Sequence, residues 1–480
     1  MSEKIVIKKV NEVNVKVYAE PSTAHELSDY FTFSIPGARF HPKVRAKIWD
    51  GKIRLYNVLT KELYFGLTAL VEDFAKERDY EVEYEFDNSA DNFSLIEAKD
   101  FAESLDIPYE VRDYQLDAFV HAVRNRRGIL LSPTASGKSL IIYLLLRYYN
   151  ARTLIIVPTV SLVHQLASDF GSYGYNETDQ ILKITAGVDK SKDANVVIST
   201  WQSIYKLPAS FYESFDVVIG DEAHLFKATS LVSIMTKLTD CKYRFGLTGT
   251  LDGTLTNKLV LEGLFGKVKK VITTSELIEQ KHISNLFIKS LVLTYPEQIC
   301  KDVKKYTYQE EIDFIVRNEA RNKFIKNLAL SLKGNTLILY QFVEKHGDEL
   351  HRLLKDCGRK VFYVHGGVDG EERNDIRAIV EKETDAIIIA SYGTMSTGTN
   401  IRNLHNLIFA SPSKSIVRIL QSIGRALRKA DNKETATLFD IADNLSHKTH
   451  INYTLEHYKE RIRIYSSEGF NYKIYKVNLK

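Results

Sequence analysis

Short apolar runs separated by amphipathic stretches fill the chain from about residue 107 to residue 443. Uninterrupted apolar strands that alternate with helices are typical of a parallel sheet covered on both faces. The pattern therefore predicts an α/β fold with two parallel-sheet domains, divided near 275–325. The predicted strands are GILLSP, TLIIVPT, NVVIST, FDVVIGDEA and YRFGLTGT in the first domain, and TLILYQF, KVFYVHG, DAIIIASYG, NLIFASP and ETATLFDIAD in the second.

The first 95 residues follow another pattern, which predicts a small α/β unit. KIVIKKV and VNVKVYA alternate polar and apolar positions, as strands do. Thr23 and Glu26 have the spacing of a capping box ahead of a helix that runs through Leu27. The runs AKIW and KIRLY flank Asp50-Gly51, and this predicts a hairpin with a type I′ turn, because glycine accepts positive φ.

Two further segments indicate boundaries. Between Glu81 and Asp106 there are nine acidic residues and one lysine among Asn, Ser and Ala, a composition typical of a linker. After residue 445, HYKERIRIYSSE predicts a helical tail rich in Lys, Arg and Tyr. The predicted order is a small domain at 1–95, α/β domains at 96–275 and 276–445, and a tail at 446–480.

Composition narrows the class of protein. The 480 residues are 44% apolar with a formal net charge of +4, which is too mild to indicate a nucleic-acid partner by itself. Cys241, Cys300 and Cys357 have neither metal-ligand spacing nor a disulfide pattern, so we expect a reduced, cytoplasmic compartment. The N-terminus lacks the apolar core of a signal peptide, and Leu140–Leu146 is too short to span a bilayer, so we expect no membrane partner.

The segment LLSPTASGKS, residues 130–139, predicts a phosphate-binding loop between a strand and a helix. Lys138 would neutralise the β- and γ-phosphates of a nucleotide, and Ser139 would place its hydroxyl on Mg²⁺. A strict P-loop has glycine where Ser132 stands. Because Ser132 and Ala135 disfavour positive φ, we expect the loop to follow a different path from a glycine-rich one. Alone, the segment could also be a polar strand-to-helix turn.

The acidic sequence DEAH at 221–224 strengthens the nucleotide hypothesis. It follows the apolar strand FDVVIG, and ligands of open α/β sheets gather at the carboxyl ends of strands. Asp221 could hold Mg²⁺ through water, and Glu222 could orient and deprotonate the attacking water. A solvated acidic turn would explain the two acids but not their position on a second apolar strand.

A basic helical segment far downstream could complete such a site. In QSIGRALR, Arg425 and Arg428 stand at i and i+3 and share one helix face. Guanidinium groups suit the developing charge on a γ-phosphate. The alternative is an ordinary basic helix face.

Residues 39–57, RFHPKVRAKIWDGKIRLYN, combine six basic side chains with one acid and three aromatic rings. Basic side chains such as Lys52 and Arg54 can follow phosphates, while exposed rings such as Phe40, Trp49 and Tyr56 can stack on bases. A hairpin with its rings in its own core and its charges in solvent is the alternative.

Seven motifs in order resemble those of superfamily-two helicases of the DEAH-box type, over about residues 107–443. The short N-terminal unit, the length, and the segments KIWDGKIRL and KYTYQEE are similar to the UvsW-type helicases of tailed bacteriophages. The resemblance implies two RecA-like domains in tandem behind a small α/β domain, with ATP in the cleft between them. The motifs are SPTASGKS, IIVPT (155–159), ISTWQS (198–203), DEAH, TGT (248–250), ASYGTMSTGTNI (390–401) and QSIGRALR.

The resemblance also implies roles for individual residues. Gln115, with Arg112 as helper, would read adenine, and His224, Thr248 and Thr250 would couple nucleotide state to domain closure. Ser132 fits the family, whereas Ala135 departs from its commoner glycine. The implied catalytic set is Lys138, Asp221, Glu222, Gln421, Arg425 and Arg428. The rest of the implied ATP loop is Pro133, Thr134, Ser136, Gly137 and Ser139. The residues implied to face nucleic acid are Thr159, Thr200, Gln202, His365, Gly366, Thr397 and Gly398, to which the basic segment adds Trp49, Lys52 and Arg54.

The function that this reading favours is an ATP-driven DNA helicase or translocase, monomeric and working in the host cytoplasm. The UvsW-type resemblance implies branched DNA as substrate, namely forks and recombination junctions, together with RNA–DNA hybrids, in phage recombination, repair and replication control. One alternative is a protein-translocating ATPase, although the chain has no room for the large peptide-binding insertion of such motors. Another is an ATP-driven annealing or clamp module that does not unwind.

Overall fold

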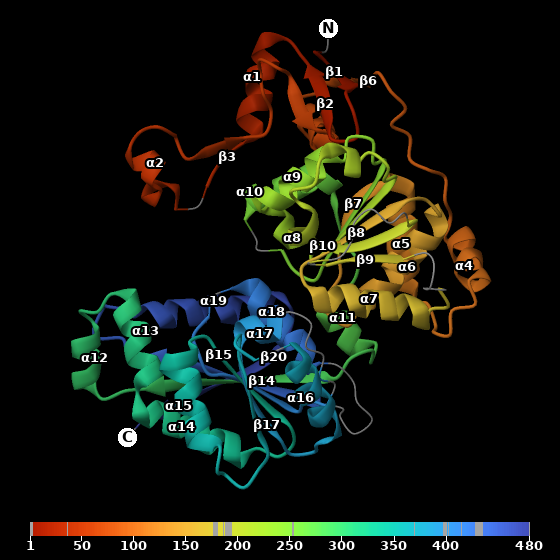
Figure 1. Cartoon of the computed structure of the whole chain (residues 1–480). Helices are drawn as coiled ribbons and strands as arrows, with labels where there is room; N and C mark the ends of the chain where they lie inside the picture. Colours follow the sequence, from red (N-terminus) through yellow and green to blue (C-terminus); the bar gives the residue numbers. More distant parts are fainter. Residues whose placement is uncertain are drawn as a thin grey trace. The chain divides into compact units, whose positions relative to one another are not determined.

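The structure is a computed structural model of the chain, which forms two compact units (Figure 1). The first comprises Met1–Ser132 and Gly137–Val271, and the second comprises Pro133–Ser136 and Ile272–Lys480. The described residues are 3–35, 37–175, 181–185, 187, 194–251, 254–368, 370–396, 401, 403–413, 415–427 and 435–479.

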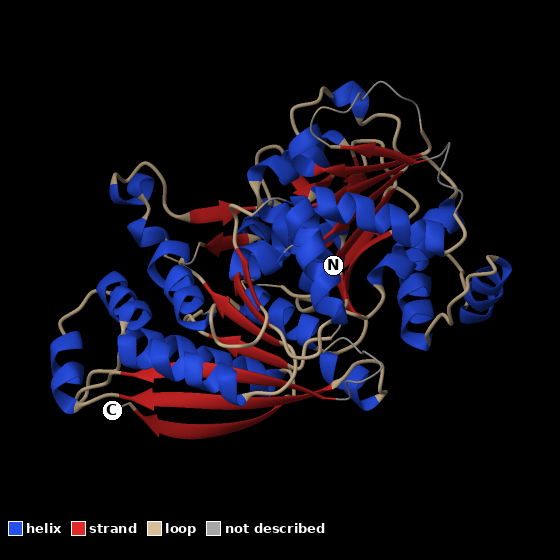
Figure 2. Cartoon of the chain, turned by 60° about the horizontal axis from the view of Figure 1, so that its bottom comes forward, coloured by secondary structure: helices blue, strands red, loops and turns tan. Residues whose placement is uncertain are grey.

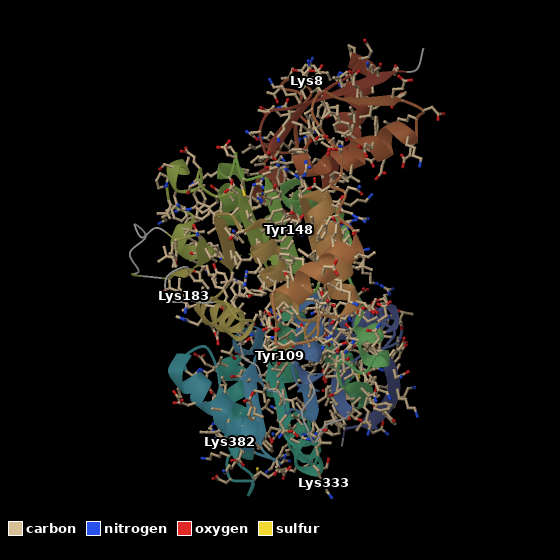
Figure 3. All side chains as sticks on the ribbon, turned by 90° about the vertical axis from the view of Figure 1, so that its right-hand side faces the viewer. Lys8, Tyr109, Tyr148, Lys183, Lys333 and Lys382 are labelled. Atoms are coloured by element: carbon tan, nitrogen blue, oxygen red, sulfur yellow. The ribbon has the colours of Figure 1, made fainter. Side chains whose placement is uncertain are left out.

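The first unit opens with a small four-stranded sheet that packs on two helices. β1 (Lys4–Lys9) pairs antiparallel with β2 (Asn14–Tyr18) and parallel with β6 (Glu81–Tyr84), and β5 (Glu62–Tyr64) flanks β2. The buried side chains of β1 and β2 pack against α1 (Pro21–Tyr30) and α3 (Thr68–Lys76); they are Ile5, Ile7, Val15 and Val17. On the outer face of β1, Lys8 pairs with Glu85 (Figure 3).

The expected helix through Leu27 is present, but the capping box ahead of it is wrong. Pro21 stands in the first turn, so α1 begins earlier and Glu20 is its N-cap, without a side-chain cap. Thr23 therefore lies inside the helix, where its hydroxyl donates to Glu3. Glu26 instead accepts from the Arg78 guanidinium at 3.1 Å.

The predicted hairpin over AKIW and KIRLY is also wrong. β4 (Lys52–Arg54) pairs with β3 (Thr32–Ser34), a partner much farther away in sequence. The residues between them form a 3-10 turn at Ala38–Phe40 and the short helix α2 (Pro42–Arg45). We call residues 32–54 the arm; in Figure 1, α2 lies at its far end, away from β1 and β2. Pro42 in the first turn favours helix over strand here.

The first large sheet has seven parallel strands, and all five predicted strands are in it. Its order is β13-β7-β12-β11-β8-β10-β9. The predicted strands are β7 (Arg127–Leu131), β8 (Thr153–Val157), β10 (Val196–Thr200), β11 (Val217–Asp221) and β12 (Tyr243–Thr248). Two short strands, β9 (Ile181–Ile184) and β13 (Val268–Lys270), were not expected from the sequence.

Helices cover both faces of this sheet, as the continuous apolar strands predict (Figure 2). Along β8, Ile155 packs on one face while Leu154 and Ile156 pack on the other. The helices of the first face are α4 (Leu95–Ser104), α5 (Asp113–Asn125), α6 (Lys138–Tyr149) and α7 (Val160–Ser172). Those of the second are α8 (Trp201–Ile204), α9 (Thr229–Lys237) and α10 (Leu255–Phe265).

The acidic stretch at 81–106 is only partly the linker that its composition suggests. It begins as β6 of the small sheet and ends as α4, which Ser94 and Glu97 start with a reciprocal capping box. The rings of Phe93, Phe101, Phe119 and Tyr148 pack together, so this segment docks on α5 and α6 (Figure 3 marks Tyr148). Irregular backbone is confined to residues 85–94.

The second unit contains another seven-stranded parallel sheet, of order β16-β17-β15-β18-β19-β14-β20. The five predicted strands are β15 (Thr336–Tyr340), β16 (Val361–Val364), β17 (Ile387–Ser391), β18 (Asn406–Phe409) and β19 (Thr435–Asn444). β14 (Asn285–Thr294) and β20 (Asn471–Asn478) add two that were not predicted. Its other elements are α11 (Thr274–Glu279), α12 (Glu297–Val303), α13 (Tyr308–Arg317), α14 (Glu319–Ser331), a π-helical turn at Val343–Gly347, α15 (Asp348–Leu354), α16 (Gly370–Lys382), α17 (Tyr392–Ser396), α18 (Ile416–Ala426) and α19 (Tyr453–Ser467).

The C-terminal segment is helical over α19, as predicted, but it then continues into β20 at the edge of the sheet. The buried carboxylate of Glu311 accepts hydrogen bonds from the backbone N–H groups of Tyr453 and Thr454, and so caps the start of α19. Farther along α19, the Arg461 guanidinium pairs with buried Asp440 at 2.9 Å. These contacts make the segment part of the second unit's core. No helix in the described part of the chain is both long and apolar enough to cross a membrane.

Candidate nucleotide site

The loop between β7 and α6 has two residues in the left-handed region. Gly137, the N-cap of α6, has φ +79°, and Ala135 has φ +68°. Ala135 thus takes positive φ although its residue type disfavours it, at a cost of about 1–2 kcal/mol for an L-residue. Such strain is typical of ligand-binding loops. A path different from that of a glycine-rich loop stays a prediction.

The loop is tied to the end of the neighbouring strand β12. The backbone N–H of buried Ser132 donates to the carbonyl of Thr248 at 2.8 Å. Lys138 opens α6, and its ammonium lies 3.3 Å from the carbonyl oxygen of Ser132. Ser139 follows, with its hydroxyl 2.8 Å from that of Tyr173. The amine and the first N–H groups of α6 thus meet at the carboxyl end of the sheet, where a helix N-terminus favours anions.

Gln115, expected to read adenine, is buried against this loop. Its side-chain carbonyl accepts from the N–H of Arg112 at 3.0 Å, and its amide nitrogen lies 3.3 Å from the carbonyl of Gly137. Arg112 in turn donates to the hydroxyl of Tyr114 at 2.6 Å. These bonds hold the start of α5 next to the phosphate-binding loop.

The two carboxylates of DEAH stand where β11 ends. Asp221 is the last residue of the strand, and its carboxylate accepts the N–H of Glu222 at 2.9 Å. Burial and the negative charge of Glu222 raise the pKa of Asp221 to about 6, against the opposing effect of the positive charge on Lys138. Glu222 itself is left-handed, with φ +53° and ψ +50°. A non-glycine residue rarely takes this conformation, which is enriched at active sites.

His224 joins this segment to the TGT turn at the end of β12. Its Nδ1 lies 2.9 Å from the hydroxyl of Thr248 and 3.3 Å from the carboxylate of Glu222. Thr248 is fully buried and donates to the carbonyl of Thr250 at 3.0 Å. The residues expected to couple the two motifs are therefore in direct contact.

The first-unit residues expected to face nucleic acid differ in their exposure and in their hydrogen bonds within the protein. Thr159 caps α7, because its hydroxyl accepts from the N–H of Leu162. Thr200 is 4% exposed and its hydroxyl pairs with that of Ser203 at 2.9 Å, so its side chain already has a partner within the protein. Gln202, on α8, is exposed.

The aromatic residues of the basic segment 39–57 are divided between core and solvent. Tyr56 is buried and donates to the carbonyl of Val17, so the expectation that it could stack on bases is wrong. Phe40 is 69% exposed, and the guanidinium of Arg39 lies 4.8 Å from the centre of its ring. Trp49 is half-buried and donates to the carbonyl of Lys52.

Basic side chains of the arm reach solvent. Lys52 and Arg54 are both exposed, although Arg54 forms an ion pair with Asp50 at 2.5 Å. The remaining exposed basic side chains are those of Arg39, Lys43, Arg45 and Lys47.

Only some of the candidate site residues of the second unit lie within the described residues. His365 and Gly366 follow β16, and His365 Nδ1 accepts from the N–H of Gly367 at 3.1 Å. Gln421 and Arg425 both belong to α18. Arg428, Thr397 and Gly398 lie outside the described residues.

Sequence reasoning missed one contact of the candidate site. The Tyr173 hydroxyl is the partner of Ser139, but Tyr173 follows the end of α7 and belongs to no motif, so no spacing in the sequence indicates it.

The assembled side chains can hold a polyphosphate and a cation. Within the described residues, no group of three or more His, Cys, Asp or Glu side chains could bind a metal ion. Mg²⁺ bound to a nucleotide needs fewer protein ligands than three. It is commonly held by one or two carboxylates, with the remaining ligands from water and phosphate oxygens. Asp221 and Ser139 fit that pattern, with Lys138 beside them to neutralise phosphate charge.

Comparison with known proteins finds matches along the whole chain. Family models match residues 4–85 (DNA helicase UvsW, N-terminal), 108–253 (type III restriction enzyme, res subunit) and 319–430 (helicase conserved C-terminal domain). The ATP-dependent DNA helicase UvsW of Enterobacteria phage T4 is 39% identical, over 97% of this chain and 98% of that protein. The crystal structure of T4 UvsW matches at 35% identity with a TM-score of 0.52, over 100% of both chains. The DNA 3′-5′ translocase XPB2 of Sulfurisphaera tokodaii is 24% identical, over 82% of this chain and 92% of its own.

Proposed function

The chain belongs to the UvsW family of ATP-dependent DNA helicases, and from this premise we propose that it remodels branched DNA. The substrates would be stalled forks and recombination junctions, together with RNA–DNA hybrids, in phage recombination, repair and replication control. The protein would act as a monomer in the host cytoplasm. The observation that best supports a working motor is the chain of contacts from Glu222 through His224 to Thr248, next to the loop that carries Lys138.

We propose the following roles at the nucleotide. Lys138 neutralises the β- and γ-phosphates, while Ser139 and Asp221 hold Mg²⁺. Glu222 orients the attacking water and accepts its proton, a role for which its left-handed backbone fixes the carboxylate next to Asp221. Bound ATP supplies the phosphoanhydride bond whose hydrolysis drives the cycle.

The same proposal assigns adenine recognition to Gln115 with Arg112, and the completion of phosphate binding to Gln421, Arg425 and Arg428. His224 transmits the nucleotide state to the TGT turn, because it touches both segments. The domain boundaries proposed are 1–95, 96–275, 276–445 and 446–480.

The arm is the proposed binding surface for duplex DNA. Its exposed lysines and arginines can follow phosphates without reading sequence, and Phe40 offers an exposed ring for stacking. Asp50 is the one acid within residues 39–57, and Arg54 already neutralises it. Gln202, His365 and Gly366 would add contacts from the motor domains.

The test is a panel of forked, four-way-junction, RNA–DNA hybrid and linear duplex substrates, scored for ATP hydrolysis and strand displacement. Forks and junctions should stimulate hydrolysis most, and displacement should require ATP. Lys47→Glu in the arm should weaken fork binding several-fold, whereas Lys355→Ala, an exposed change in the second unit, should not. Equal stimulation by every substrate would contradict the branched-DNA role, and ATP-driven annealing without displacement would contradict unwinding.

A further inference from the structure

A cavity lies where the small N-terminal sheet meets the first large sheet, away from every residue assigned to the nucleotide. Its volume is about 270 Å³. The wall comes from three parts of the first unit: the end of β1 with residues 65–72, the irregular segment 87–90, and the motor-domain residues 121–127, 242 and 266–267. This volume is just below the range typical of small-molecule sites and has room for one or two phosphate groups.

The wall carries more positive than negative charge. Its cations are Lys9, Arg124, Arg126, Arg127, Lys242 and Lys267, whereas its carboxylates are Glu12, Glu72 and Asp87.

Each of the three carboxylates already has donors. Glu12 lies 2.6 Å from the ammonium of Lys9 and 2.9 Å from the guanidinium of Arg127. Glu72 accepts the hydroxyl of Tyr84 at 2.6 Å. Asp87 accepts both the N–H and the hydroxyl of Ser89.

Fewer of the cations in the wall are paired with a carboxylate of the same wall. Arg126 and Lys267 pair with Asp91 and Asp73, which do not line the cavity. Exposed Arg124 donates to a backbone carbonyl, that of Phe93. Lys242 is exposed, and in the described part of the chain no carboxylate lies within salt-bridge distance of it.

A second observation points the same way. Two guanidiniums, those of Arg127 in the cavity wall and of fully buried Arg244, converge on one residue, Glu12: Arg127 binds its carboxylate and Arg244 donates to its backbone carbonyl at 2.8 Å. The Nε of Arg244 has no hydrogen-bond partner. Burial, together with the positive charge of Arg244, lowers the pKa of Arg127 to about 9. Two poorly hydrated guanidiniums thus lie against Glu12, but only that of Arg127 binds its carboxylate, so positive charge exceeds negative charge at this part of the wall.

We propose that this cavity is an anion site that takes a phosphate group, held mainly by Lys242 and Arg124, with Arg127 in the same wall. Residues of both the N-terminal sheet and the motor domain line the cavity, so a phosphate bound there would stabilise the contact between them. The phosphate could belong to the backbone of bound DNA or to a small phosphate compound, and both carry the same tetrahedral oxyanion. Binding of the small compound does not depend on the proposed function.

The test is calorimetric titration of pyrophosphate into full-length protein. All samples carry Lys138→Ala, so that the P-loop does not contribute. Lys242→Glu is the test substitution, and Lys99→Ala is the matched control, because Lys99 is an exposed lysine of the same unit that does not line the cavity. Circular dichroism verifies that each variant is folded.

We expect one binding event that weakens at least tenfold in Lys242→Glu and stays within twofold in Lys99→Ala. Equal affinity in all three proteins, or no binding at millimolar pyrophosphate, would overturn the proposal. A short DNA duplex then distinguishes the two sources: if DNA phosphate occupies the cavity, duplex displaces pyrophosphate and binds less tightly to Lys242→Glu. If a small compound does, the duplex has neither effect. ATP hydrolysis by the unmodified protein reports on the motor separately.

Discussion

Replacing Gly137 with alanine perturbs the phosphate-binding loop at its tightest point. Gly137 has φ +79°, and a Cβ added there would lie 2.3 Å from the amide nitrogen of Gln115. No real Cβ tolerates that distance. Gln115 is 3% exposed and has little space to retreat, so both the backbone and this side chain must change.

The expected cost is the sum of two effects. Alanine in the left-handed region costs about 1–2 kcal/mol. Displacing Gln115 breaks its bonds to Arg112 and Gly137, each worth about 1 kcal/mol. Against this, alanine restricts the unfolded chain, which returns about 0.4–1 kcal/mol. The net loss in the free energy of unfolding is about 2–3.6 kcal/mol, or about 4–14 °C in melting temperature for a unit of this size.

Gly174 provides the matched control. It also has positive φ, +93°, but a Cβ there would meet nothing within 4 Å. Gly174→Ala should therefore carry the backbone strain alone and cost about 1 kcal/mol or less. Thermal unfolding of both variants, with KM for ATP and for GTP, separates strain from the displacement of Gln115. We expect Gly137→Ala to raise KM for ATP at least tenfold and to narrow the preference for ATP over GTP, while Gly174→Ala changes neither.

If Gly137→Ala and Gly174→Ala have the same melting temperature and the same KM for ATP, the role given to Gln115 is wrong. That result would mean that Gln115 moves without cost, and that its contact with the loop does not support nucleotide binding.

Three further outcomes follow from the structure. Glu222→Gln should lower kcat by about 100-fold or more through loss of the general base, while nucleotide binding measured by fluorescence titration persists. The pKa of Asp221 is raised to about 6, so its carboxylate takes up a proton as the pH falls through that value and can no longer hold a cation. The pH profile of kcat/KM should therefore decline below pH 6. A flat profile down to pH 5 would contradict the role of Asp221 as a Mg²⁺ ligand. Glu12→Gln leaves buried Arg127 without its carboxylate partner and should cost about 3 kcal/mol by thermal unfolding. Glu26→Gln breaks an exposed pair and should cost under about 1 kcal/mol. Equal losses would show that the Glu12–Arg127 pair is not buried in the way described.

Much of the fold can be read from the sequence because burial on both faces of a parallel sheet leaves continuous apolar runs. All ten strands predicted from such runs exist. β14 and β20 were missed because polar positions interrupt them: residues 285–289 expose alternate side chains, and β20 lies at the sheet edge, mostly in solvent.

The arm shows why local patterns can mislead. KIRLY does contain a strand, but its partner is Thr32–Ser34 rather than the adjacent AKIW, and only tertiary structure selects that pairing. Helix α2, begun by Pro42, takes up the intervening residues. The capping box at Thr23 failed for a similar reason, since Pro21 starts the helix sooner.

The candidate site was predictable where chemistry depends on strand ends. Lys138 opens the helix that follows β7, and Asp221 ends β11 of the same parallel sheet, as the position of each motif after an apolar strand indicates. Backbone conformation was not predictable: Ala135 and Glu222 both adopt positive φ, which their residue types disfavour. The contact of Tyr173 with Ser139 depends on how α7 ends, and no motif records it.

The most direct test of the motor is hydrolysis of ATP by Lys138→Ala protein, with and without forked DNA. We expect fork-stimulated turnover to fall by at least about 100-fold, since the amine beside the phosphates is lost, while fork affinity without nucleotide stays within twofold. Lys138→Ala protein that retains full fork-stimulated turnover would show that this loop is not where ATP is hydrolysed.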